Sequence, residues 1–226
     1  MTASPRNTLY LRWISANSLG EFLGLGATFA LGYVLFARYE PHNTFEIIVQ
    51  ALLMTSSGLL EGAVVGTLQW YALRRLLHMR RRAWVWATII GAVLAWAAGS
   101  LPMSLVSLGS QASGETAAEP AGWLMLVLEV ALGLVAGAIL SLAQMMVLRK
   151  SVNRAGWWVL ANGAAWALGM PVIFLAINLV QCAASPVVMV VIIAIGLALT
   201  GALVGTVHGL ALVRLSYTPR DMMMPD

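Results

Sequence analysis

The chain has 226 residues, of which 60% are hydrophobic and only 10% are charged, and its mean hydropathy is +0.84. A soluble domain carries about 25% charged residues, so the composition excludes an ordinary soluble protein and favours a membrane protein. The net charge of +4 does not indicate a nucleic acid partner, because the basic residues flank hydrophobic segments as they do in membrane proteins. The single cysteine, Cys182, excludes an intrachain disulfide and a cysteine-rich metal site.

Six apolar runs long enough to cross a bilayer follow one another along the chain. They predict spans at 13–36, 46–73, 83–108, 121–148, 156–180 and 187–213. We expect the first run to be retained as a span and not cleaved as a signal peptide, because it is long enough to cross the membrane. A polar, acidic loop is expected at 109–120 and a mobile tail at 217–226. The sequence therefore predicts an all-α integral membrane protein with a single six-helix domain over residues 1–226.

The basic residues gather on one side of this predicted bundle. Of the 13 Lys and Arg residues, all but Arg38 lie at the termini or in the connections after the second and fourth spans. By the positive-inside rule, both termini are predicted to be cytoplasmic. Aromatic residues near the same side predict an interfacial belt, formed by Trp13, Trp70, Tyr71, Trp84, Trp86, Trp157 and Trp158. We expect a multi-pass protein of a bacterial inner membrane, in contact with the lipid bilayer.

A stripe of small residues ending in a polar one recurs in the second, fourth and sixth spans. The copies are Gly58, Gly62, Gly66 and Gln69; Gly133, Gly137, Ser141 and Gln144; and Gly201, Gly205 and His208. Residues four and three apart share one helix face, and small residues on that face let membrane helices approach closely. We favour this packing role over the alternative, in which the stripe leaves room for a flat ligand or a narrow path.

The first, third and fifth spans also resemble one another. The stretch 13–24 is similar to the stretch 158–169, and we match the last eight residues of both to the stretch 92–99 of the third span. The repeated unit is then a helical hairpin used three times, over about 9–77, 83–150 and 156–216. This arrangement predicts a compact bundle with approximate threefold symmetry.

Five polar side chains are expected at one depth, roughly 7–12 Å inside the cytoplasmic boundary at ~1.5 Å per helical residue. They are Asn17, Gln69, Gln144, Asn162 and His208. Because they come from five different spans, we predict one interhelical hydrogen-bond network that fixes helix register. The alternative is that the same layer forms a binding site.

Three acidic residues fall inside the spans and are expected to be buried: Glu21, Glu61 and Glu129. An ionised group at mid-bilayer costs about 2.5–3.5 kcal/mol, so such residues usually face the interior and usually have a function. Glu61 is the foremost candidate, because it lies near the middle of its span and no Lys or Arg occurs inside any span. It either donates a hydrogen bond to a backbone carbonyl or forms, with the other two, a staggered proton or cation path.

His208 is the only histidine within a span. The neighbouring Gly205 and Gly209 would let a planar macrocycle approach it, so axial ligation of haem or another tetrapyrrole is one hypothesis. We favour membership of the polar layer and expect no cofactor and no metal. The sequence contains no His-Glu-x-x-His, Walker or dinucleotide motif, so we expect no enzyme.

Three functional hypotheses remain. The first is a non-catalytic accessory or interaction subunit of a larger bacterial membrane assembly, with other membrane proteins as partners. The second is a small solute or ion permease whose path is lined by Glu61 and the polar layer, since internal repeats are common in transporters. The third is a haem- or pigment-binding subunit that uses His208.

Overall fold

The computed structural model describes residues 4–36, 41, 43–77, 79–113 and 121–216. Within these residues the protein is entirely helical, with six helices and no strand. The helices are α1 (Pro5–Phe36), α2 (Thr44–Leu73), α3 (Arg81–Ser113), α4 (Gly122–Leu148), α5 (Trp157–Val180) and α6 (Pro186–Ser216). The predicted mobile tail at 217–226 lies outside the described residues.

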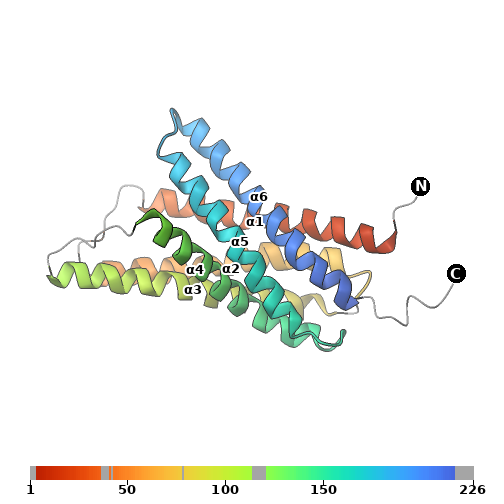
Figure 1. Cartoon of the computed structure of the whole chain (residues 1–226). Coiled ribbons are helices and arrows are strands. Elements are labelled where there is room, and N and C mark those ends of the chain that lie inside the picture. The colour runs from red at the N-terminus through yellow and green to blue at the C-terminus, as the bar shows by residue number, and fades with distance from the viewer. Residues whose placement is uncertain (1–3, 37–40, 42, 78, 114–120, 217–226) are drawn as a thin grey trace, which may run out of the picture.

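The six helices form a closed ring. Each helix packs against the helices that precede and follow it in the chain, and α6 closes the ring by packing against α1. Figure 1 shows α6 lying over α1, while the chain progresses through α2, α3, α4 and α5 around the bundle. Side chains that point inward therefore meet along a common axis, although they come from helices far apart in the sequence.

Helix ends follow capping chemistry that the sequence carries. The Ser4 side chain accepts a hydrogen bond from the Asn7 backbone N–H at 3.3 Å, and Pro5 takes the first helical position, where its missing N–H is harmless. The Asn43 side chain accepts from the Glu46 N–H at 3.0 Å in the same way at the start of α2. Ser185 and Pro186 repeat the first arrangement at α6.

Two predicted boundaries were wrong. Helix α1 begins at Pro5 and not at residue 13, because the Ser4–Pro5 cap was not recognised in the sequence. Helix α3 continues to Ser113, so the residues from 109 to 113 are helical where a loop was predicted. The remaining part of that predicted loop, 114–120, lies outside the described residues.

The helices are suited to a membrane. Five of them, α2 to α6, are long and apolar enough to cross a bilayer, while α1 falls short of the same measure. The outward faces carry large exposed apolar side chains, including Leu52 at 64%, Leu160 at 62% and Leu199 at 57% exposure. Lipid is the environment in which such surfaces are stable. The protein is therefore a multi-pass helical membrane protein.

The larger of two buried clusters among the described residues lies at one end of the ring. We call this the basic end: it contains the start of α1, the end of α6 and the two connections 74–80 and 149–156, whose residues meet in one buried cluster. In α3, every buried residue lies between Trp84 and Ala92. In α4, burial begins at Gly133. The helices diverge toward the opposite end, as Figure 1 shows for α3 and α5.

Candidate functional site

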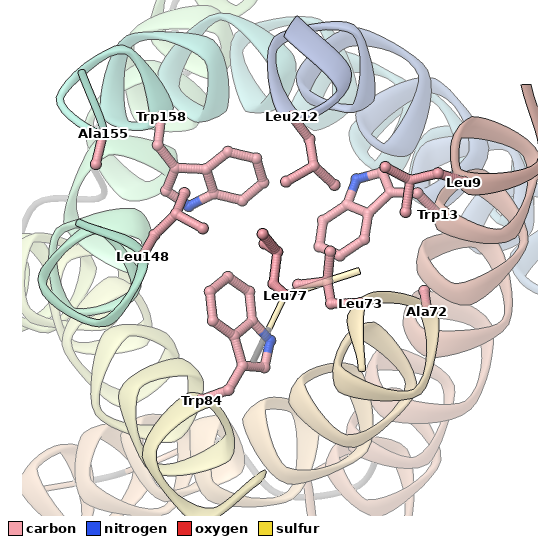
Figure 2. Packing of buried hydrophobic residues seen from close by; sticks show 10 residues of the cluster. All are labelled: Leu9, Trp13, Ala72, Leu73, Leu77, Trp84, Leu148, Ala155, Trp158 and Leu212. Atoms are coloured by element: carbon pink, nitrogen blue, oxygen red, sulfur yellow. The ribbon is translucent and has the colours of Figure 1, made fainter. Parts of the chain in front are cut away.

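Three tryptophans close the axis of the ring at the basic end. Trp13, Trp84 and Trp158 come from α1, α3 and α5, and none is exposed. The centroid of the Trp158 ring lies 5.8 Å from that of Trp13 and 6.4 Å from that of Trp84. These helices are not neighbours in the ring, so the indoles meet across its interior. Figure 2 shows the three indoles pointing toward a common centre.

Leucines complete this layer. Leu73, Leu148 and Leu212 come from the ends of α2, α4 and α6 and are fully buried. Leu77, from the connection between α2 and α3, lies between the indoles in Figure 2 and is 7% exposed. The side chains of this layer fill the axis, so the basic end of the ring is packed.

The aromatic-belt prediction was wrong for these three tryptophans. Trp13, Trp84 and Trp158 lie in the core and not at a lipid interface, because each points along its helix's inward face. Trp86 and Trp157 point outward and are 59% and 61% exposed. The amino-acid composition near a helix end does not show whether a tryptophan points into the core or outward.

A connected set of side-chain hydrogen bonds joins α1, α2, α3 and α4 one turn deeper than the tryptophan layer. The Gln144 amide donates to Gln69 Oε1 at 3.0 Å and to Thr88 Oγ1 at 2.9 Å. Gln69 Nε2 in turn donates to Asn17 Oδ1 at 2.9 Å. Since α4 does not pack against α2, the Gln144–Gln69 bond crosses the interior of the ring.

The tryptophan layer is bonded to this polar layer. Trp158 Nε1 donates to Gln144 Oε1 at 3.1 Å, and Trp13 Nε1 donates to His208 Nδ1 at 2.8 Å. Asn17 and Asn162 each donate to the carbonyl of the tryptophan four residues earlier, at 2.7 and 2.8 Å. Of the five side chains predicted at one depth, Asn17, Gln69 and Gln144 are bonded directly to one another, while His208 and Asn162 are connected to them only through Trp13 and Trp158.

The polar layer has a sixth member that was not identified in the sequence. Thr88 is fully buried and donates to the Trp84 carbonyl at 2.9 Å, as Asn17 and Asn162 donate to Trp13 and Trp158. The matching of α3 to α1 and α5 was therefore shifted by one helical turn. The signal that identifies the register is a tryptophan followed four residues later by a polar side chain, which occurs in all three odd helices.

Trp84 differs from the other two tryptophans. Its indole N–H is buried and has no hydrogen-bond partner among the described residues. Gln69 in α2 is equivalent to Gln144 in α4, which accepts a hydrogen bond from Trp158. Gln69 is therefore the expected acceptor for Trp84, but its Oε1 accepts from Gln144 instead. The polar layer is therefore asymmetric at this point.

His208 is enclosed on all sides by this arrangement. It is 1% exposed, and its ring centroid lies 5.5 Å from that of Trp13 and 5.3 Å from that of Trp158. Because Nδ1 accepts the Trp13 hydrogen bond, a neutral His208 carries its proton on Nε2, which then has no lone pair for a metal. The residues present do not fit an axial ligand of haem, and the space that Gly209 leaves is taken by the Trp13 and Tyr10 rings.

Two of the three predicted acids meet in the interior. Glu21 and Glu61 are 2% and 5% exposed and lie close enough to interact electrostatically. Glu61 Oε2 accepts a hydrogen bond of 2.6 Å from Trp96 Nε1. Glu21 Oε2 is buried with no partner among the described residues. Buried polar atoms are normally hydrogen-bonded. The Glu21–Glu61 pair is therefore a second polar feature of the interior, separate from the polar layer.

Glu129 does not join the other two. It is partly exposed, so the prediction that it is buried was wrong. The reason is that it lies in the first half of α4, where the ring packs loosely and no side chain before Gly133 is buried. Of the three acids in the predicted staggered path, only Glu21 and Glu61 therefore lie close together.

The small-residue stripes face the next helix around the ring. The α2 stripe faces α3, and a Cβ on Gly62 would lie 2.6 Å from Ile89 Cα. The α4 stripe faces α5, where a Cβ on Gly137 would lie 2.6 Å from the Asn162 carbonyl oxygen. Gly58, Gly66, Gly133, Gly201 and Gly205 are similarly close to the neighbouring helix. The Ser141 hydroxyl turns back to the Gly137 carbonyl at 2.8 Å.

Comparison of this chain with protein-family models, curated proteins and solved structures finds no match.

Proposed function

We propose that all six helices cross a bacterial inner membrane, with both termini on the cytoplasmic side and three hairpins as repeated units. The place of α1 in the ring, between α2 and α6, supports its assignment as the sixth span. The gathering of basic residues at the basic end supports the orientation. The equivalent contacts of Trp13, Trp84 and Trp158 support the repeat.

The protein acts, in this proposal, as a non-catalytic subunit of a larger membrane assembly. One observation carries it: the halves of α3 and α4 away from the basic end bury no side chain. In α3 this holds from Val93 onward, and in α4 it holds up to Leu132. In contrast, α5 continues to bury side chains as far as Ala176.

The exposed halves carry large apolar side chains and no Lys or Arg. In this half of α3, the Ser100 hydroxyl bonds to that of Thr55 in α2 at 3.0 Å and Trp96 Nε1 donates to Glu61 of α2 at 2.6 Å. Just beyond the exposed half of α4, Gly133 approaches the Trp166 backbone of α5. In a membrane, helices associate by close packing and not by hydrophobic force. The seam between α3 and α4 is therefore where we place the transmembrane helix of a partner protein.

Site-specific photo-crosslinking in native membranes tests this proposal. A crosslinking amino acid at Val106 in α3 or Leu126 in α4 should yield an adduct with one defined membrane protein. The matched controls are Leu168 in α5 and Leu199 in α6, which are 53% and 57% exposed and should face lipid. Equal adducts from all four positions, or none from the first two, would contradict the proposal. Affinity purification in mild detergent should then recover that partner at fixed stoichiometry.

The Glu21–Glu61 pair favours a second candidate, a proton- or cation-coupled permease. Acids buried in the interior of a membrane bundle usually have a function there. Here two of them interact, and one oxygen of Glu21 has no partner within the described ranges. Under this candidate, Glu61→Gln abolishes coupled uptake in proteoliposomes while Glu129→Gln does not, because Glu129 is separate from the pair. Wild-type proteoliposomes that take up no member of a broad solute panel would eliminate it.

A further inference from the structure

A groove lies between α5 and α6 on the outer surface of the basic end, with a volume of about 510 Å³. Its lining includes Trp157 and Leu160, which are 61% and 62% exposed. Trp158, the next residue after Trp157, points to the axis of the ring instead. The groove therefore faces the surroundings of the bundle and is separate from the polar layer.

Two arginines line the same groove. Arg154 belongs to the connection before α5, and Arg214 lies in the last turn of α6. Within the described part of the chain, neither forms an ion pair or a stacking contact. Arg154 has a φ of 57° and its carbonyl accepts from the Trp157 N–H at 3.1 Å, so it sits on a defined turn. Glycine adopts this positive φ without strain, whereas arginine does not. The backbone conformation therefore does not account for an arginine at this position, and its side chain is the feature to explain.

Two other arginines at this end, Arg74 and Arg81, are engaged by aromatic rings. The Arg74 guanidinium lies 4.7 Å from the Tyr71 ring centroid and 5.7 Å from that of Trp70. Arg81 lies 5.8 Å from the Trp70 centroid. Such cation–π contacts occupy the guanidinium faces. The pair at the α5–α6 groove thus combines two unengaged guanidinium groups with an apolar floor.

The geometry points to a specific site for an anionic glycerophospholipid in the α5–α6 groove, with its phosphate between Arg154 and Arg214. Guanidinium groups bind phosphate through paired hydrogen bonds, which favours arginine at such sites. Trp157 is the residue type that lies at headgroup level. One acyl chain lies along Leu160 and over the small side chains of Ala161 and Ala211. This site is independent of any partner at the α3–α4 seam.

Native mass spectrometry of the full chain, titrated with dioleoyl phosphatidylglycerol or dioleoyl phosphatidylcholine, tests the site. One phosphatidylglycerol should bind more tightly than the rest, and phosphatidylcholine should not replace it. The double variant Arg154→Gln/Arg214→Gln should bind that lipid roughly 30-fold more weakly, or about fivefold for each arginine. The matched control Arg149→Gln/Lys150→Gln removes two positive charges from the connection that contains Arg154, outside the groove, and should bind as the wild type does.

A variant that keeps both arginines tests whether lipid binding depends on the shape of the groove or only on surface charge. Ala211→Phe fills the apolar floor of the groove, where Ala211 is partly exposed, and should weaken the lipid at least fivefold in protein whose unfolding matches that of the wild type. Equal losses in the two double variants would show diffuse attraction to the basic end and overturn the site. Unchanged binding in Arg154→Gln/Arg214→Gln, or equal retention of phosphatidylcholine, would overturn it as well.

Discussion

The two ends of the helical ring are built differently. At the basic end, tryptophans and leucines from all six helices fill the axis, and a hydrogen-bond network ties the helices together one turn deeper. At the opposite end, α3 and α4 extend with no buried side chain from Val93 and up to Leu132. A membrane helix bundle is held by close backbone approach and interhelical hydrogen bonds. The network lies at the basic end, and close backbone approaches at Gly62, Gly133 and Gly201 lie near the middle of their helices. The basic end and the adjoining middle of the bundle therefore set the fold.

This contrast separates a structural role from a role in recognition. At the basic end, side chains pack and form hydrogen bonds with one another. At the α3–α4 seam, apolar helix faces stay exposed and can contact another membrane helix. Substitutions at the basic end should therefore change the stability of the isolated protein. Substitutions at the seam should leave that stability alone and change association.

The largest effect is expected at Gly62. A Cβ there would lie 2.6 Å from Ile89 Cα, and backbone cannot move aside as a flexible side chain can. Gly62→Ala should lower the free energy of unfolding by about 3 kcal/mol or more. Gly109→Ala is the matched control, because nothing lies within 4 Å of its added Cβ. Unfolding in detergent, followed by fluorescence, compares them, and an unchanged Gly62→Ala would show that α2 and α3 do not pack so closely.

The next effect is expected at Gln144, which takes part in three side-chain hydrogen bonds. At about 0.6 kcal/mol for each such bond in a membrane protein, Gln144→Leu should lower stability by about 2 kcal/mol. Asn162→Leu removes a side-chain bond to one backbone carbonyl and should cost about 0.6 kcal/mol. The same unfolding measurement decides, and equal losses for both would deny that Gln144 is the centre of the network.

A smaller effect distinguishes the tryptophans. Trp13→Phe removes the hydrogen bond to His208, whereas Trp84→Phe removes an indole N–H that has no partner in the described part of the chain. Trp13→Phe should therefore be the less stable of the two by about 0.6 kcal/mol. If Trp84→Phe is instead as damaging as Trp13→Phe, its N–H is bonded to a buried water, which would appear as an ordered molecule in an experimental structure.

Much of this architecture could be predicted from the sequence. Length and hydropathy located six helices to within a few residues at most boundaries, because a membrane span needs a long apolar run. The depth of Asn17, Gln69, Gln144, Asn162 and His208 followed from helical rise and the nearest basic residue. The stripes of small residues were recognisable because their spacing of four is a helix property.

Other features depend on orientation, which the sequence does not specify directly. Trp158 and Trp157 are adjacent, yet one fills the axis and the other faces outward. The burial of Glu129 was predicted from its span alone, whereas the structure leaves it partly exposed where α4 has few neighbours. The pairing of Glu21 with Glu61, and the place of Thr88 in the network, required knowing which inward faces lie at the same level around the ring.

The smallest stability effect is expected at the seam, and it is the sharpest test of the contrast between the two ends. Leu126 is 52% exposed in α4, so Leu126→Ala should change the unfolding free energy of the isolated protein by no more than about 0.5 kcal/mol. Leu148→Ala, in the same helix but fully buried at the basic end, should cost about 2 kcal/mol or more. If a partner helix packs at the seam, Leu126→Ala lowers the yield of the co-purified partner although the protein itself is as stable as the wild type. A variant that loses stability and partner together would instead place Leu126 in the packed part of the ring, and the division between a fold-setting end and a recognition seam would be wrong.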